Sequence, residues 1–144
     1  MAIGEDVIYL QKKYHTTSPF EMAKAMGTIL LFEDLGSING YYNKFLRIKQ
    51  IHINSNLDSH LKRFTCAHEL GHSIYHPDAN TPFLRDCTFM STSRLEIEAN
   101  TFAMYFLITN DDLVECQCDT TNQLARYFGY TKEMIELRLK GGPS

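Results

Sequence analysis

The sequence predicts an α+β fold in which one helix is followed by a small sheet and then by further helices. Three observations support this. Apolar and polar residues alternate at the end of 48–54, as in a strand with one wet face. Apolar or small residues recur with helical spacing from 57 to 74. The predicted strands follow one another instead of alternating with helices, which disfavours a βαβ repeat.

The first predicted helix starts at Ser18-Pro19, because proline suits the first helical turn, and it stops at Gly27. An apolar strand over 28–35 comes next. Gly36 and Asn39-Gly40 then mark a turn. Two further strands are expected near 38–43 and 48–54.

Asp58 or Ser59 can cap the next helix, which continues to Pro77. A loop over 77–91 leads to a helix over about 93–108. The tail after Asp111 is predicted to be helical in two pieces, with a break near Gly129.

The bulk composition fits one soluble domain over 1–144, with the helical segment 111–140 as part of it. A net charge of −3 disfavours nucleic acid as a partner. No apolar stretch reaches the roughly 18 to 20 residues of a membrane span, and the first fifteen residues lack the features of a secretory signal. The four cysteines form no CxxC pair and are expected to be thiols. A cytoplasmic protein is therefore expected.

The segment 64–76, FTCAHELGHSIYH, carries the clearest chemistry. His68 and His72 are four positions apart, so both imidazoles project from one helix face, as two ligands of a tetrahedral Zn²⁺ must. Glu69 stands next to the first of them and can act as a general base toward a water molecule. The alternative is an ordinary helix surface, since H-E-x-x-H is short. Gly71 disfavours that alternative. Glycine is costly inside a helix, and a common reason for its presence is the close approach of another element.

A catalytic zinc site needs a third protein ligand. His76 is two turns from His68, about 12 Å along the helix axis, and is better placed for support of the site than for ligation. Asp78 is disfavoured because Tyr75 and Pro77 occupy positions where the chain would have to turn back. The third ligand is therefore sought in the next predicted helix.

In 94–107, RLEIEANTFAMYFL, Glu96 shares a helix face with two alanines and Asn100, which suits close packing against Gly71. Glu96 is favoured as the ligand, with Glu98 as the second choice. Asn100 is a candidate for hydrogen bonding to a ligand histidine. The alternative for Glu96 is local, because Ser93-x-x-Glu96 is also a capping box.

These segments resemble the ImmA/IrrE family of metallopeptidases. HELGHSIYH matches its metal-binding motif, and LEIEANTFAMYFL is similar to its E-x-x-A-N/D-x-F-A helix. IHIN and QLARYFGYTKEMIELRL look like further family segments, so the likeness extends over about 18–139. It implies a zincin-like fold, in which a small, mostly antiparallel sheet packs on the H-E-x-x-H helix.

By position, the resemblance implies that His68, His72 and Glu96 bind Zn²⁺ and that Glu69 is the base. It also implies a bacterial or phage-encoded endopeptidase that cleaves a helix-turn-helix transcriptional repressor. The competing hypothesis is an anti-repressor that binds and sequesters a regulator without proteolysis.

Residues 121–140 also resemble a helix-turn-helix unit, which would favour binding to DNA. The second helix of this segment is poor in basic residues, and Glu133 and Glu136 offset those it has. A packing role is therefore favoured over a DNA reader.

Overall fold

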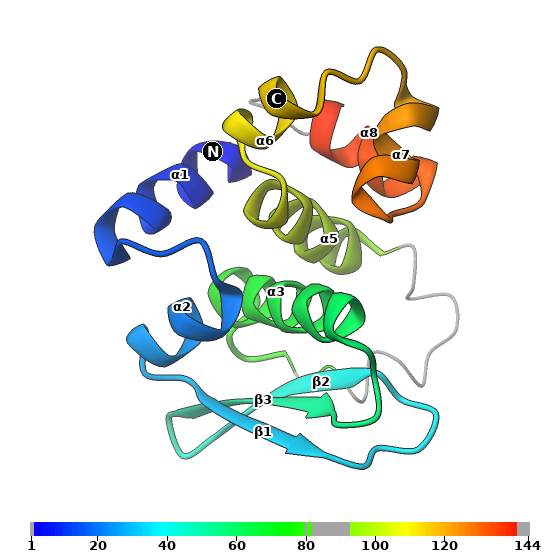
Figure 1. Cartoon of the computed structure of the whole chain (residues 1–144). Helices are drawn as coiled ribbons and strands as arrows, with labels where there is room; N and C mark the ends of the chain where they lie inside the picture. Colours follow the sequence, from blue (N-terminus) through cyan, green and yellow to red (C-terminus); the bar gives the residue numbers. More distant parts are fainter. Residues whose placement is uncertain (1, 80, 82–92, 141–144) are drawn as a thin grey trace.

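A three-stranded sheet covers one side of the central helix α3, and the remaining helices lie mostly on its other side (Figure 1). The computed structural model describes residues 2–79, 81 and 93–140. The elements, in chain order, are α1 Ile3–Tyr14, α2 Pro19–Ala25, β1 Ile29–Glu33, β2 Gly40–Phe45, β3 Ile48–Asn54, α3 Ser59–Tyr75, α5 Arg94–Leu107, α6 Asn110–Cys116, α7 Thr121–Phe128 and α8 Lys132–Lys140.

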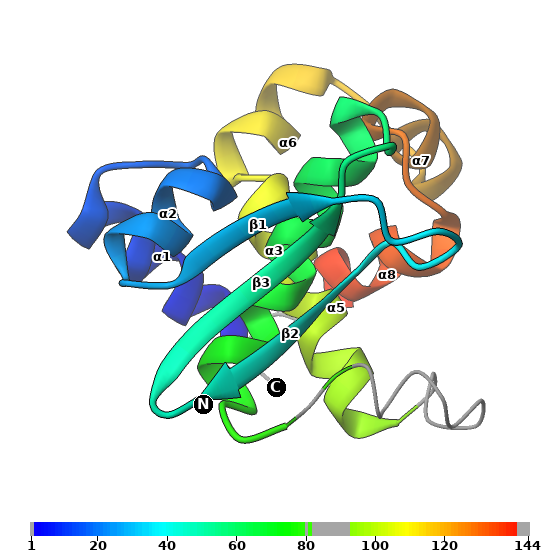
Figure 2. The ribbon, with the colours of Figure 1, turned by 90° about the horizontal axis from the view of Figure 1, so that it is seen from below.

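The sheet is mixed, with strand order β1-β3-β2 (Figure 2). β3 runs parallel to β1 and antiparallel to β2. The prediction of an α+β fold is confirmed, whereas the expected mostly antiparallel sheet is wrong. The reason is that β3, and not β2, lies next to β1, and the β2–β3 hairpin gives β3 the direction of β1.

Local sequence signals determine where α3 and its neighbours begin. Asp58 caps α3 by accepting a hydrogen bond from the backbone N–H of Leu61 at 2.8 Å, and Ser18 caps α2 in the same way at 3.3 Å. Both starts agree with the predictions. α1 was not predicted, and Val7 on this helix is buried in the core against α5 and α2.

Gly71 lies at a close contact between α3 and α5. A β-carbon at this position would be 3.1 Å from Cβ of Phe102 and 3.2 Å from Cα of Ala99. A larger residue would push the two helices apart. The close approach inferred from Gly71 is confirmed, and it brings the first turn of α5 alongside the histidines of α3.

The C-terminal region contains three helices instead of the two predicted pieces. Gly129 ends α7 with φ +80°, as expected, but Gln117 adds a second left-handed stop at φ 54°. α8 packs on α5, with Ile135 and Arg138 buried. The Arg138 guanidinium donates from Nε to the carbonyl oxygen of Ile108 at 2.7 Å. These contacts support the packing role predicted for 121–140.

Within the described ranges, no helix combines the length and apolarity that membrane crossing requires. Cys66, Cys116 and Cys118 are free thiols, as predicted, whereas Cys87 and most of the predicted loop 77–91 lie outside the described residues.

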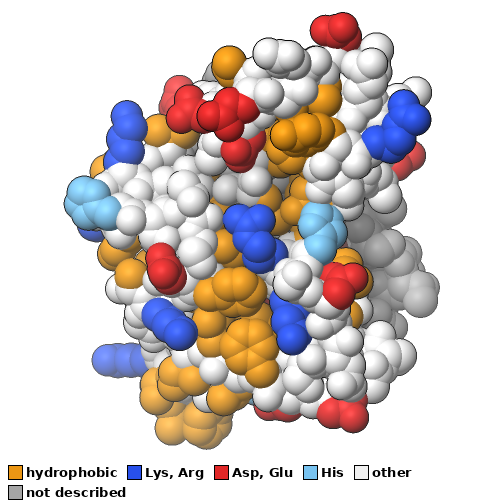
Figure 3. All heavy atoms as spheres, in the orientation of Figure 1, with side chains coloured by type: hydrophobic (Ala, Val, Ile, Leu, Met, Phe, Trp, Pro, Cys, Tyr) orange, Lys and Arg blue, Asp and Glu red, His pale blue; other side chains and the backbone are white. Residues whose placement is uncertain are grey.

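On the face drawn in Figure 3, acidic and basic side chains are interspersed. That face shows no continuous basic surface of the kind that binds nucleic acid.

Candidate metal centre

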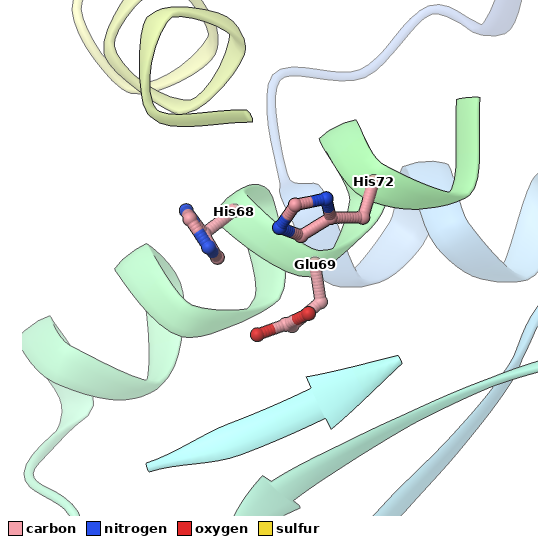
Figure 4. A group of neighbouring side chains, drawn as sticks. All are labelled: His68, Glu69 and His72. Atoms are coloured by element: carbon pink, nitrogen blue, oxygen red, sulfur yellow. The ribbon is translucent and has the colours of Figure 1, made fainter. Parts of the chain in front are cut away.

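His68, Glu69 and His72 lie in the second half of α3, and all three are buried. Their ligand atoms lie within 4.8 Å of one another. Figure 4 shows the two imidazoles on one side of the helix, while the Glu69 carboxylate points toward the sheet. The four-residue spacing therefore places the two histidines together, as predicted from helical periodicity.

Glu96, in the first turn of α5, brings its carboxylate between these two imidazoles. Its Oε2 lies 2.7 Å from Nε2 of His72, and its Oε1 lies 3.2 Å from Nε2 of His68. The Ser93 side chain accepts from the backbone N–H of Glu96 at 3.3 Å, so this serine does cap α5. The Glu96 side chain, however, contacts the two histidines. Of the capping box, therefore, only the hydrogen bond to the Ser93 side chain is observed.

The electrostatics of Glu96 agree with this placement. Burial alone would raise the pKa of the Glu96 carboxyl, but the two imidazoles beside it hold that pKa well below its usual range. The group is therefore a carboxylate at neutral pH, the form that binds cations.

The buried nitrogens of His68 test whether a metal suits these residues. Neither Nδ1 nor Nε2 of His68 has a hydrogen-bond partner in the described part of the chain, although both are buried. A buried polar atom without a partner costs about 1–3 kcal/mol. Nε2 faces the Glu96 carboxylate at 3.2 Å without the alignment of a hydrogen bond. Two imidazoles and one carboxylate at these distances are the donor set of a zinc site with an open position, so the residues fit the metal.

A pocket opens over this group of side chains. It is lined by His68, Glu69 and Glu96 together with Asn39, Phe64, Thr65 and Asn100. Asn39 precedes β2, while Phe64 and Thr65 lie one turn before His68 on α3. The pocket is thus formed by α3, α5 and the residue before β2, and it reaches His68, Glu69 and Glu96.

Thr81 is a residue of this region that the sequence did not single out. Its hydroxyl lies 3.3 Å from Oε1 of Glu69, and it bonds to the backbone N–H and carbonyl of Tyr42 on β2 at 2.5 and 3.1 Å. Thr81 is fully buried. No sequence signal marks it, because its partners are 12 and 39 residues away and belong to different elements.

The other candidates have separate positions. His76 lies behind His72, with 3.0 Å between their Nδ1 atoms. Glu98, the second choice for the third ligand, contacts His76 at 2.7 Å. Asp78 is exposed and pairs with Lys44 at 2.6 Å, in line with its rejection as a ligand. Asn100 lines the pocket, and its hydrogen bond to a ligand histidine stays a prediction.

Residues 23–140 match the model of the Peptidase M78 family, described as an IrrE N-terminal-like domain. The chain belongs to this family. The resemblance to ImmA/IrrE proteins inferred from the motifs is thereby confirmed.

Two relatives and one solved structure add detail. Metallopeptidase ImmA of Bacillus subtilis (strain 168) is 31% identical over 134 residues, covering 89% of this chain and 78% of that protein. Uncharacterized immunity region protein 2 of Bacillus phage phi105 is 44% identical over 100 residues, covering 69% of this chain but only 63% of the phage protein. A Mycobacterium tuberculosis transcriptional regulator shares the fold, with a TM-score of 0.61 at 15% identity. That match covers 96% of this chain and 46% of the regulator.

Proposed function

We propose that this protein is a zinc-dependent endopeptidase that cleaves a helix-turn-helix transcriptional repressor and so relieves repression. One observation carries the proposal. The Nε2 atoms of His68 and His72 lie 3.2 and 2.7 Å from the two oxygens of Glu96, and His68 and Glu96 line the same pocket as Glu69. In this proposal His68, His72 and Glu96 hold the zinc, and Glu69 is the catalytic residue.

Zinc bound by these residues would supply Lewis-acid chemistry in the pocket. The metal has to be held with a position left open toward the substrate. The three proposed ligands come from two helices, α3 and α5, and the pocket on their β2 side leaves room for such an open position.

Glu69 would move the protons of the reaction. Its carboxylate would take a proton from the attacking water and deliver it to the departing amine of the cleaved peptide bond. Its position supports that role, because the carboxylate lines the pocket but points away from the two imidazoles, toward the sheet (Figure 4). The Thr81 hydroxyl contacts Oε1 at 3.3 Å and restricts how the carboxylate turns.

The family resemblance and the names of two relatives support a repressor as the substrate. One is named a metallopeptidase, and another is named an immunity region protein of a phage. The ImmA/IrrE resemblance of the motifs implies a repressor as the substrate, and these names are compatible with that proposal. The negative net charge and the mixed charges of the surface in Figure 3 favour a protein partner over DNA.

The decisive experiment co-expresses the chain with the helix-turn-helix protein encoded by a neighbouring reading frame. The parent is expected to produce a discrete repressor fragment. Glu69→Gln should abolish the fragment and still purify with one zinc per chain, since the glutamine leaves His68, His72 and Glu96 in place. Glu115→Gln, at an exposed position on α6, is the matched control and should cleave like the parent.

Two outcomes would contradict the proposal. Purified parent without stoichiometric divalent metal would refute the metal centre. Relief of repression by Glu69→Gln, without any fragment, would support the competing hypothesis that the protein sequesters its regulator.

A further inference from the structure

A line of hydrogen bonds leads from His72 away from the pocket and toward the surface. Nδ1 of His72 lies 3.0 Å from Nδ1 of His76, and Nε2 of His76 lies 2.7 Å from Oε1 of Glu98. Arg94 donates from Nε to the other oxygen of Glu98 at 3.2 Å. The side chains become steadily more exposed along this line, from 0% for His72 to 7%, 29% and 88% for His76, Glu98 and Arg94.

Two helix ends create this line. His76 is the C-cap of α3, one turn after His72, and its backbone N–H donates to the carbonyl oxygen of His72 at 2.7 Å. Glu98 lies in the second turn of α5, two residues after Glu96. The packing of α3 on α5 therefore places Glu96 beside Nε2 of His72. It also places Glu98 beside His76, which contacts Nδ1 on the other side of the His72 ring.

The sequence of contacts determines where the protons lie. A carboxylate only accepts, so Nε2 of His76 carries a proton and donates it to Glu98. When Nε2 of His72 binds zinc it carries no proton, so the proton of the neutral ring lies on Nδ1 and is donated to Nδ1 of His76. In this arrangement His76 holds the protonated Nδ1 of His72, and Nε2 is the nitrogen that faces Glu96.

We propose that His76 and Glu98 are positioning residues for the metal centre: they orient the His72 ring and hold the proton on its Nδ1, so that Nε2 is presented for ligation. This inference rests on the zinc site of the proposed function. It gives Glu98, considered above as a second choice of ligand, a different role, because its Oε1 is held by His76.

The contrast with His68 shows why this support should matter. Within the described residues, Nδ1 of His68 has no hydrogen-bond partner, so His68 is oriented mainly by packing, including a ring contact with Phe64 at 5.8 Å. His72 is the one proposed histidine ligand with an observed hydrogen-bonded orienting group there. Loss of such outer partners typically weakens metal binding about 10–100-fold.

The test measures zinc affinity directly, without reference to peptidase activity. Metal-free protein is titrated with Zn²⁺ in competition with a chromophoric chelator. His76→Phe and Glu98→Ala are expected to weaken zinc binding about 10–100-fold. His76→Gln should retain most of the affinity, because the amide can accept from His72 and donate to Glu98. Arg94→Gln, which alters the exposed end of the line, should bind like the parent.

Circular dichroism of the metal-free variants verifies that each one folds. If His76→Phe fails to fold, Glu98→Ala decides, because that side chain is partly exposed and its removal leaves the core intact. Zinc binding by Glu98→Ala and His76→Phe within about twofold of the parent would overturn the positioning role alone. A parent that binds no zinc would overturn the metal centre, and this inference with it.

Discussion

Gly40, the first residue of β2, should be intolerant of even a methyl group. A β-carbon at Gly40 would lie 2.5 Å from the carbonyl oxygen of His52 on β3 and 2.5 Å from Cγ2 of Thr65 on α3. Relaxed contacts between carbon atoms are about 3.5–4.0 Å. Gly40→Ala therefore requires β2 to move by about 1 Å from both neighbours, and one of them is backbone that cannot rotate away.

The expected cost can be estimated from two opposing effects. Overpacking of a well-filled site typically costs about 1–3 kcal/mol. Replacing glycine also lowers the entropy of the unfolded chain, which returns about 0.4–1 kcal/mol. Because the backbone contact cannot relax, we expect a net loss of about 2 kcal/mol, which lowers Tm by roughly 4–8 °C in a chain of this size.

Urea unfolding of the metal-free protein, followed by circular dichroism, measures this loss. Thr65→Ser is the companion variant, because it removes Cγ2 and keeps the hydroxyl. In the double variant, the methyl conflict is gone and the conflict with His52 stays, so about 0.5–1 kcal/mol should be recovered relative to additivity. A Gly40→Ala protein within about 0.5 kcal/mol of the parent would refute the close approach of β2 to α3.

Three further predictions concern separate features. Glu96→Ala should purify without stoichiometric zinc, whereas Ser93→Ala should lose about 1 kcal/mol of helix-cap stability and keep the metal; equal zinc contents by elemental analysis would contradict the ligand role. Burial, aided by the negative charge of Asp78, raises the pKa of Tyr42 from 10.0 to about 12. As pH rises, the phenol ionises first in the unfolded chain, so the stability contribution present below pH 10 is lost between pH 10 and 12. In urea unfolding, the stability of Tyr42→Phe should therefore fall less steeply over this pH range. Cys66 is fully buried, and burial raises the pKa of its thiol, so iodoacetamide should leave it unmodified until the protein unfolds, as peptide mass mapping would show.

Helix starts were the most predictable part of the fold, because their signals are local. Ser18 and Asp58 each satisfy a backbone N–H within three residues of their own position. Gly129 ends a helix because it adopts a left-handed backbone conformation without strain. These requirements are met by neighbouring residues, so the sequence of a short segment is enough to locate them.

The sheet was less predictable for the opposite reason. The β2–β3 hairpin turns at Leu46 and Arg47, with φ of 51° and 71°, although neither residue is typical of a left-handed turn. Asn39-Gly40 has the composition of a turn, yet Gly40 begins β2. Glycine is required at position 40 because β2 approaches β3 and α3 closely there, and not because the chain turns. The distinction depends on contacts between β2 and elements that follow it in the chain.

The candidate site likewise combines residues predicted from local spacing with residues whose role depends on distant contacts. Helical spacing suffices to predict that His68 and His72 share a face. Whether Glu96 is a ligand or a helix cap depends on its contacts with α3. The residues around Ser93 do not reveal those contacts. The geometry shows that both local patterns are used, the serine for the helix end and the glutamate for the histidines.

The edge of β2 connects the proposed base with the place where an extended peptide would bind. β2 is an outer strand of the sheet, so its outward backbone groups are available for strand addition in principle. At Tyr42 both of these groups are bonded to the Thr81 hydroxyl, which also contacts Glu69. A peptide pairing along β2 therefore has to displace Thr81 or bind on one side of Tyr42. Displacement of Thr81 would remove its contact with the Glu69 carboxylate, so the edge of β2 and the proposed base share one contact network.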